Sequence, residues 1–345
     1  MPCGASTMRR HRTKEDTDVK TRTIAGREVN AVGLGCMGLS HAYGTAVEKS
    51  EAVDTLRQAF DMGYNFFDTA ECYTGLNADG TISYNEEIVG EAIRPFRDKV
   101  FLATKCGVRH SNRGLLVDSR PETIRKSVEG SLKRLGTDYI DLYYQHRIDP
   151  DVSPEDVADT MADLVKEGKI LSWGISETDE TYLRLAHAVC PVAAIQNRYS
   201  MIARWYEKTM FPVVEELGIA YVAFSPIANG FLSGKYNQNS QFEQGDYRNF
   251  MPQYTAEGME KGKDLLEFLN TLAARKNATP AQISLAWILG KKDYIIPIPG
   301  SRKVERLKEN LDSASVVLSP AEIEDIDARL DGMDFLVFGG HAATK

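Results

Sequence analysis

The chain alternates short apolar runs with longer amphipathic runs, and this alternation constrains the fold more than any other feature. The apolar runs have strand length, are rich in Val, Ile, Leu or aromatic residues, and are flanked by Gly, Pro, Asp or Ser. Strands that alternate with helices form βαβ units with a parallel sheet. Eight units predict an α/β fold, a (β/α)8 TIM barrel, although counting alone leaves an open sheet as the alternative. The eight runs are 31–36, 65–68, 100–105, 139–144, 170–175, 192–196, 220–225 and 294–298.

The amphipathic runs carry helix start and stop signals. Pro121 opens one run and Gly136 closes it, and Ser153 and Thr279 each precede a proline at a helix start. Gly63 is the expected C-cap of the first helix. These signals place helices between the predicted strands, as a barrel requires.

The domain prediction is one barrel over residues 21–335, with a flexible N-terminal tail at 1–20 and a C-terminal tail at 336–345. Two long polar segments, 72–85 and 229–256, interrupt the alternation. Each follows a predicted strand, so we expect both as long loops on the C-terminal rim of the barrel, where barrels carry their functional residues.

Composition excludes several classes of protein. A hydrophobic fraction of 43% is too high for a disordered chain, and the net charge of −8 argues against a nucleic-acid partner. No apolar stretch reaches about 18 residues, so no membrane span is expected. The first 20 residues lack the apolar core of a secretion signal, and five scattered cysteines form no disulfide pattern. We therefore predict a cytoplasmic protein; its oligomeric state stays open.

Four polar side chains stand where predicted strands end. Asp68 and Lys105 end two of the apolar runs, His146 comes shortly after a third, and Tyr73 lies in the loop after Asp68. In a barrel these ends converge on one mouth. A buried ammonium is costly without a carboxylate, which makes Asp68 the expected partner of Lys105. One such residue is more often a cap or an ion pair, but four together favour a catalytic site.

The residues around these four form seven ordered blocks, which resemble the aldo-keto reductase family over roughly residues 21–330. The similarity is greatest to a bacterial and plant branch that includes pyridoxal reductases and auxin-induced-type proteins. The blocks are FFDTAECY (66–73), LATKCG (102–107), DLYYQHRIDP (141–150), KEGKILSWGIS (166–176), IQNRYS (195–200), AFSPIANGFLSGKY (223–236) and IPIPGSRKVERLKEN (296–310).

The resemblance implies NADPH-dependent reduction of an aldehyde or ketone to the alcohol. Tyr73 would give the proton, and Lys105, held by Asp68, would lower the pKa of Tyr73 from its ordinary value near 10 toward neutrality. His146 would donate a hydrogen bond to the carbonyl oxygen. No metal is expected, because the six histidines show no ligand spacing.

The expected cofactor is NADP(H). The segment Gly33–Gly38 lacks the GxGxxG spacing of a dinucleotide-binding turn, so the cofactor would lie across the barrel rim, as the resemblance implies. The residues that the resemblance assigns to it are Gly35, Cys36, Met37, Asp68, Ser176, Gln196, Phe224, Ser225, Pro226, Ile227, Asn229, Gly230, Leu232, Gly234, Lys235, Gly300, Ser301, Arg302, Arg306, Glu309 and Asn310.

Charged side chains stand in or directly beside two of these blocks. Arg302, Lys303 and Arg306 surround a helix start near Val304, which favours an anion, although a solvated helix start is the plainer interpretation. Glu177 stands where the family usually has Asn after the carboxamide-binding serine. A carboxylate accepts hydrogen bonds but donates none, so this contact to the nicotinamide carboxamide is in doubt.

Two other functions remain as alternatives. The family includes cofactor-binding subunits of potassium channels, and a barrel lyase would use Lys105 as a Schiff base. The substrate is expected to be a small carbonyl compound. Tyrosines of the expected rim would fit an aromatic or cyclic one, or simply pack the loops; they are Tyr73, Tyr84, Tyr199, Tyr236, Tyr247 and Tyr254.

Overall fold

The computed structural model describes residues 20–111 and 114–337. Eight parallel strands follow one another in chain order within one sheet. Every predicted run overlaps one of them, with boundaries that differ by at most three residues. The strands are β3 (Leu34–Gly35), β4 (Phe66–Asp68), β7 (Phe101–Cys106), β10 (Leu142–Gln145), β11 (Trp173–Ser176), β12 (Ala194–Arg198), β13 (Ala220–Phe224) and β14 (Ile295–Pro297).

The sheet closes between its first and last strands. The Gly33 N–H donates to the Pro297 carbonyl oxygen at 3.0 Å, next to the start of β3. A Cβ atom on Gly35 would lie 2.7 Å from the Ile298 carbonyl oxygen, and one on Gly300 would lie 2.2 Å from the Gly35 carbonyl oxygen. Only glycine permits this close approach of the two chain segments. The predicted (β/α)8 barrel is therefore confirmed, and the open sheet is excluded.

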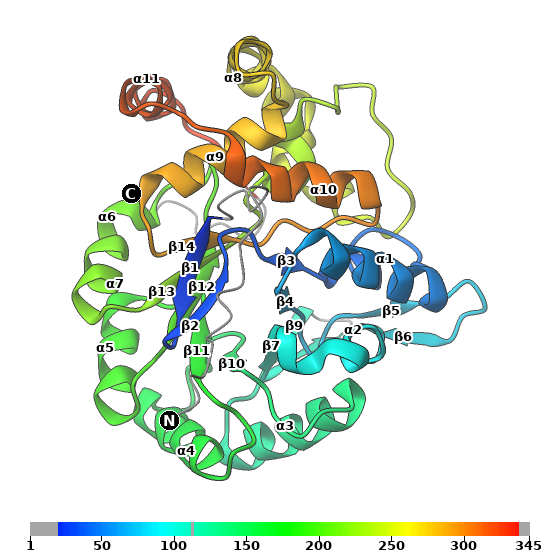
Figure 1. The fold of residues 1–345 in the computed structure, drawn as a ribbon, viewed down its shortest axis with the longest axis vertical. Helices are drawn as coiled ribbons and strands as arrows, with labels where there is room; N and C mark the ends of the chain where they lie inside the picture. Colours follow the sequence, from blue (N-terminus) through cyan, green and yellow to red (C-terminus); the bar gives the residue numbers. More distant parts are fainter. Residues whose placement is uncertain (1–19, 112–113, 338–345) are drawn as a thin grey trace, which may run out of the picture.

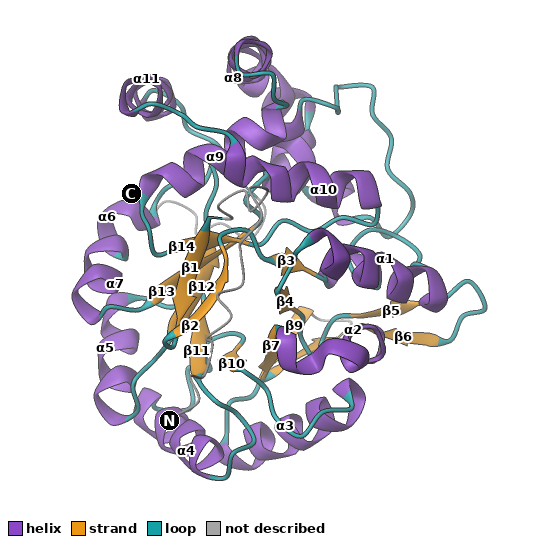
Figure 2. Cartoon of the chain, in the orientation of Figure 1, coloured by secondary structure: helices purple, strands orange, loops and turns teal. Residues whose placement is uncertain are grey.

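Helices surround the barrel strands, as Figures 1 and 2 show. Gly63 and Gly136 end their helices with φ of 115° and 63°, and Thr279 forms a capping box with Gln282. The predicted caps are thus confirmed. The surrounding helices are α1 (Lys49–Met62), α2 (Asn85–Ile93), α3 (Pro121–Leu135), α4 (Pro154–Lys166), α5 (Glu180–Val189), α6 (Tyr206–Thr209), α7 (Phe211–Leu217), α9 (Pro280–Lys291) and α10 (Val304–Asp312). Two further helices, α8 (Ala256–Arg275) and α11 (Pro320–Asp331), lie outside this ring.

The long segments between strands and helices are more regular than expected. Segment 72–85 forms a hairpin of β5 (Thr74–Leu76) and β6 (Ile82–Tyr84), and β8 (Val108–Ser111) pairs with β9 (Gly114–Val117) in a second hairpin that the sequence did not predict. Segment 229–256 folds into short 3-10 turns. These turns are η3 (Ala228–Ser233), η4 (Tyr247–Phe250) and η5 (Pro252–Tyr254).

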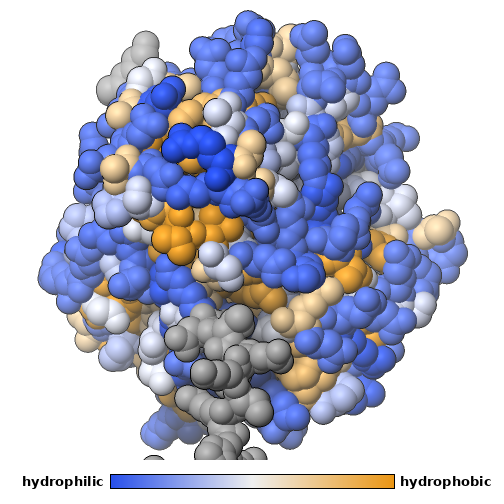
Figure 3. Space-filling view, turned by 45° about the horizontal axis from the view of Figure 1, so that its top comes forward, coloured by the Kyte–Doolittle hydropathy of each residue, from blue (hydrophilic) through white to orange (hydrophobic). Residues whose placement is uncertain are grey.

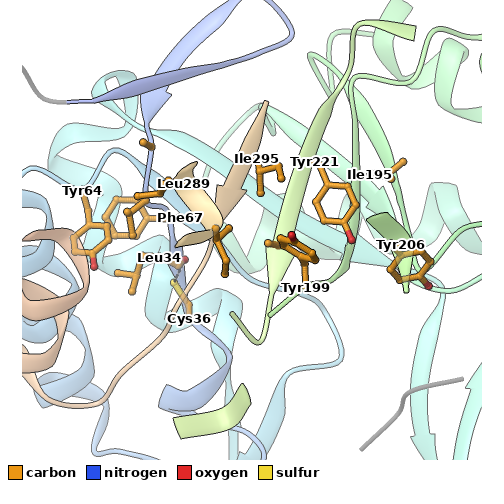
Figure 4. Close-up of a cluster of buried hydrophobic side chains, with 14 of the residues drawn as sticks. Leu34, Cys36, Tyr64, Phe67, Ile195, Tyr199, Tyr206, Tyr221, Leu289 and Ile295 are labelled. Atoms are coloured by element: carbon orange, nitrogen blue, oxygen red, sulfur yellow. Dashed lines mark hydrogen bonds between the residues drawn. The ribbon is translucent and has the colours of Figure 1, made fainter. Parts of the chain in front are cut away.

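The hydrophobic core has an inner and an outer layer. Phe66, Phe101, Tyr144 and other inward-facing strand residues fill the barrel, and the hairpin of β1 (Thr21–Ile24) and β2 (Arg27–Asn30) packs Ile24 and Val29 against them. The outer layer lies between strands and helices, where Figure 4 shows Leu34, Phe67, Tyr199, Tyr221 and Ile295 among its members. Because side chains pack closely in both layers, the strand ends that carry the candidate catalytic residues are held in fixed positions.

The surface seen in Figure 3 is mainly hydrophilic, with smaller hydrophobic areas between the polar side chains. Within residues 20–111 and 114–337, no helix is long and apolar enough to cross a membrane. Apart from residues 20, 336 and 337, the two expected tails lie outside the described residues.

Candidate active site

The four candidate catalytic residues come together at the C-terminal mouth of the barrel. Asp68 ends β4, Lys105 lies near the end of β7, and His146 follows β10. These three strands are neighbours in the sheet, so their ends bring the side chains to one side of the mouth. Tyr73 reaches the same place from the turn between β4 and the β5–β6 hairpin. The predicted convergence of these residues is confirmed.

Lys105 is the centre of this cluster. Its ammonium donates to Asp68 Oδ1 at 2.5 Å, to the Thr69 carbonyl oxygen at 2.7 Å and to Tyr73 Oη at 3.2 Å. Three acceptors satisfy the three N–H donors of an ammonium group. The Gln196 amide donates to the second carboxylate oxygen of Asp68 at 2.7 Å. The side chain of Lys105 is 0% exposed, so this set of contacts holds it in a single geometry.

The Lys105–Asp68 pair keeps its charges despite burial. Burial by itself lowers the pKa of Lys105, but the Asp68 charge and the Tyr73 phenol outweigh it, so the pKa of Lys105 is raised above its usual value. Burial raises the pKa of Asp68, while the Lys105 ammonium and the Gln196 amide oppose that rise. We take the pair as ionised, because each group is the other's hydrogen-bonded counter-ion.

The expected fall in the pKa of Tyr73 is wrong. Burial raises the pKa of the Tyr73 phenol to about 12, and the Lys105 ammonium lowers it by less than burial raises it. Desolvation of the buried phenol is the larger cause, and the neighbouring Lys105 charge is the smaller one. The phenol therefore keeps its proton at neutral pH and can act as a proton donor.

His146 lies beside Tyr73 and Cys72. The Tyr73 and His146 rings meet edge to face with centroids 5.7 Å apart, and Cys72 Sγ is 3.4 Å from His146 Nδ1. Burial and the charges of Arg147 and Lys105 hold the pKa of His146 well below its usual value, so the imidazole is neutral. Burial also raises the pKa of the Cys72 thiol to about 12. A protonated thiol that donates to Nδ1 leaves the ring N–H on Nε2.

One cavity of about 1240 Å³ extends from this cluster along the barrel rim. Most of the predicted cofactor residues line it, which brings together strand ends and rim segments far apart in the chain. These lining residues are Gly35, Met37, Asp68, Ser176, Gln196, Phe224, Ser225, Pro226, Ile227, Asn229, Gly230, Lys235, Gly300, Ser301, Arg302, Arg306, Glu309 and Asn310.

Three predicted cofactor residues do not line the cavity. Cys36 and Leu232 are 1% and 0% exposed and pack in the outer core layer, where Figure 4 shows Cys36 near Leu34. Gly234 ends η3 in the left-handed region, with φ of 68°. Cys36 and Leu232 thus point into the core, and Gly234 lies in a turn. The sequence blocks alone do not show which of their residues face the cavity.

The far end of the cavity carries the predicted basic cluster at the start of α10. Arg302 donates to the carbonyl oxygens of Gly38, at 2.5 Å, and Thr45, at 3.0 Å, so it also bridges two loops. Its buried Nη2 has no partner in the part of the chain that the structure describes. Arg306 pairs with Glu309 at 2.6 Å and is half-buried. This end offers positive charge beside a helix N-terminus.

Ser176 and Glu177 differ in their relation to the cavity. Ser176 lines it and accepts a hydrogen bond from Arg147 at 3.1 Å. Glu177 is not among the lining residues; its Oε1 accepts from the backbone N–H of Arg198 at 3.0 Å. The unusual Glu177 therefore has a structural contact of its own.

Sequence reasoning missed part of the cavity wall. His41 stacks over Tyr73 with ring centroids 6.0 Å apart, and its Nε2 is 3.3 Å from Tyr247 Oη. Arg248 pairs with buried Asp246 at 2.5 Å and lies over the rings of Tyr43, Tyr236 and Phe242. These contacts join the rim segment 229–256 to the loop after β3. The residues that make these contacts lie singly in polar loops. They form no motif with regular spacing, so the sequence alone does not single them out.

The tyrosine-rich rim is only partly as expected. Tyr73, Tyr236 and Tyr247 line the cavity, but Tyr199 is 0% exposed and packs against Trp287 with centroids 5.4 Å apart. Tyr199 belongs to the core because it lies beyond the end of β12 on the outward side. Within the described residues, no group of three or more His, Cys, Asp or Glu side chains is placed to hold a metal ion.

The barrel carries a Tyr–Lys–Asp–His cluster at its mouth and a long cavity along its rim. Known proteins that are similar in sequence show which family of barrel proteins this is. The sequence profile described as "Aldo/keto reductase family" matches residues 31–331. A soybean (Glycine max) protein named "Probable aldo-keto reductase 1" is 37% identical over 305 residues, which cover 87% of this chain and 85% of that protein. This chain belongs to the aldo/keto reductase family.

Solved structures agree with this assignment. A glycerol dehydrogenase from Gluconobacter oxydans superposes with a TM-score of 0.80 at 28% identity, covering 90% of this chain and 96% of the other. An aldo/keto reductase from Klebsiella pneumoniae, in complex with NADP and acetate, gives a TM-score of 0.70 at 26% identity, covering 92% and 99%.

Proposed function

We propose that this protein reduces an aldehyde or ketone to the alcohol with NADPH, and that Tyr73 gives the proton. The contact that carries the proposal is Tyr73 Oη at 3.2 Å from Lys105 Nζ, with Asp68 Oδ1 at 2.5 Å from the same ammonium. A phenol that contacts an ammonium, which a carboxylate in turn holds, forms a proton-donating group that a fixed charge orients.

The cavity fits NADP(H), the cofactor of the Klebsiella relative. Buried Arg302 Nη2 lacks a partner among the described residues and lies at the basic end, where it and Arg306 would hold a phosphate of the cofactor. Gln196 and Ser176 at the other end would hold the nicotinamide carboxamide. When bound, NADPH supplies the hydride that the carbonyl carbon accepts.

The residues of the chain complete the reaction at the carbonyl oxygen. Tyr73 donates its proton to that oxygen as negative charge develops on it. Neutral His146 donates a hydrogen bond from Nε2 to the same atom and stabilises the charge. Lys105 remains charged throughout and stabilises the tyrosinate that is left. Asp68 and the Thr69 carbonyl oxygen hold the ammonium in place.

The Schiff-base alternative is disfavoured by the state of Lys105. A lysine that attacks a carbonyl must lose its proton, which requires a lowered pKa. Here the pKa of Lys105 is raised, and all three N–H bonds are used. A cofactor-binding regulatory subunit remains a functional alternative, and turnover distinguishes it from an enzyme.

A panel of aldehydes and ketones, followed by NADPH absorbance, tests the proposal. We expect NADPH oxidation that depends on the carbonyl compound, with one alcohol formed for each NADPH consumed. Tight NADPH binding with no turnover of any compound would instead support the regulatory subunit.

Replacing Arg306 with Ala should weaken NADPH binding by about 10- to 100-fold and change NADH binding little. A charge-assisted contact to a phosphate contributes about 1.5–3 kcal/mol, and NADH lacks the 2′-phosphate. Arg306 is the cleaner variant, because Arg302 also bridges Gly38 and Thr45. Fluorescence titration with both cofactors measures the change. An equal loss for NADH and NADPH would assign Arg306 to the diphosphate or to structure.

The pH dependence follows from the pKa of Tyr73. Reduction needs the protonated phenol, and this form persists up to a pKa of about 12. The reduction rate should therefore stay flat from about pH 7 to about pH 9. Alcohol oxidation needs the phenolate and should rise with pH across that range. Rates measured in both directions with saturating cofactor check this, and a reduction rate that falls through about pH 8 would contradict it.

A further inference from the structure

Two arginines line the catalytic end of the cavity, and the mechanism uses neither. Arg147 follows His146 at the end of β10, and Arg198 is the last residue of β12. Strand β11, with Ser176 at its end, lies between them in the sheet. Both residues therefore line the cavity at neighbouring strand ends, on the side of the mouth that also carries His146.

Arg198 is buried and forms no ion pair within the described residues. It is 8% exposed, and its guanidinium makes no hydrogen bond or ion pair with any residue that the structure describes. Its Nε is fully enclosed and unpartnered within that part of the chain, and the group lies over the Phe224 ring at 4.9 Å. A buried charged donor without an acceptor is costly unless a ligand supplies one.

Arg147 reinforces this excess of positive charge. Its Nη1 donates to the His146 carbonyl oxygen at 2.6 Å and to Ser176 Oγ at 3.1 Å, which are neutral acceptors. Burial lowers the pKa of Arg198, and the charge of Arg147 lowers it further, so the two groups act on each other. Glu177 is the one carboxylate that raises the pKa of Arg198. The two guanidinium groups thus outnumber the one carboxylate that acts on Arg198.

We propose that Arg147 and Arg198 bind a carboxylate carried by the substrate, so that the preferred substrate is an aldehyde or ketone with an acidic group. This inference rests on the proposed carbonyl reduction and adds the class of substrate to it. A guanidinium binds a carboxylate through two parallel N–H bonds. The cofactor phosphates have a basic site of their own in Arg302, Lys303 and Arg306 at the opposite end of the cavity.

A matched pair of substrates tests the carboxylate. The probes are 4-formylbenzoate and its methyl ester, which differ in charge and share the reacting aldehyde. We expect wild-type kcat/KM to be at least about tenfold higher for the acid. In Arg198→Met this ratio should fall by about tenfold or more, and in Arg198→Lys it should fall less. Arg109→Met, an exposed arginine on β8 outside the cavity lining, is the control and should keep the wild-type ratio.

Binding measurements separate this inference from the proposed function. Terephthalate, which lacks the carbonyl group to be reduced, should bind the protein in calorimetry and should bind Arg198→Met at least about tenfold more weakly. Equal wild-type kcat/KM for acid and ester, or unchanged terephthalate binding in the variant, would overturn the carboxylate site while carbonyl reduction stands. Weaker NADPH binding in Arg198→Met with the acid preference intact would assign the arginine to the cofactor. Normal terephthalate binding without turnover of any aldehyde would refute the proposed function alone.

Discussion

Replacing Tyr73 with Phe should lower kcat for carbonyl reduction by about 10²- to 10⁴-fold, because general acid catalysis contributes about that much. Phenylalanine keeps the ring that meets His146 edge to face at 5.7 Å and removes only the hydroxyl that faces Lys105. The proton acts on the substrate oxygen, so the dissociation constant of NADPH should change little. Steady-state kinetics and a fluorescence titration measure the two quantities separately.

A matched control for this variant is Tyr84→Phe. Tyr84 precedes α2, is 36% exposed and does not line the cavity, so its hydroxyl should not affect turnover. If Tyr73→Phe reduced aldehydes at the wild-type rate, another group would have to supply the proton. His146 would be the next residue to examine.

Replacing Lys105 with Met should cost both stability and activity. The change leaves the Asp68 carboxylate, which is 2% exposed, without its counter-ion. Removing one partner of a buried ion pair costs about 3–5 kcal/mol in the free energy of unfolding. Turnover should fall at least as far as in Tyr73→Phe, because the tyrosinate loses the adjacent positive charge. Urea unfolding and steady-state kinetics check the two effects.

The double variant Asp68→Asn/Lys105→Met separates the two effects. It removes both charges together, so it should regain most of the lost unfolding free energy, because no unpaired charge remains buried. Its activity should stay as low as that of Lys105→Met. Recovery of activity along with stability would mean that the pair serves the fold and not the chemistry.

The barrel and the catalytic cluster could be predicted from sequence because both depend on local patterns. The strands are short apolar runs, the helices carry caps such as Gly136 and Thr279, and strand ends converge in any parallel barrel. Asp68, Lys105 and His146 stand at such ends, so their meeting follows once the fold is known.

Other features depend on packing that the sequence does not display. The pKa of Tyr73 was predicted in the wrong direction because burial outweighs the Lys105 charge. Cys36 and Leu232 were assigned to the cofactor from sequence blocks, but their side chains pack in the core. Arg198 and Arg248 lie against the rings of Phe224 and Tyr43, which belong to other segments, and those segments come together only in the folded chain.

Transfer of deuterium tests the central claim most directly. NADPH carrying deuterium at the reactive position of the nicotinamide is incubated with an aldehyde and the protein, and the alcohol is analysed by mass spectrometry. The account predicts one deuterium on the alcohol carbon, in an amount equal to the NADPH consumed, with product formation slowed by about 10²- to 10⁴-fold in Tyr73→Phe. Alcohol without deuterium, or NADPH that binds while no alcohol forms, would contradict hydride transfer at this barrel mouth.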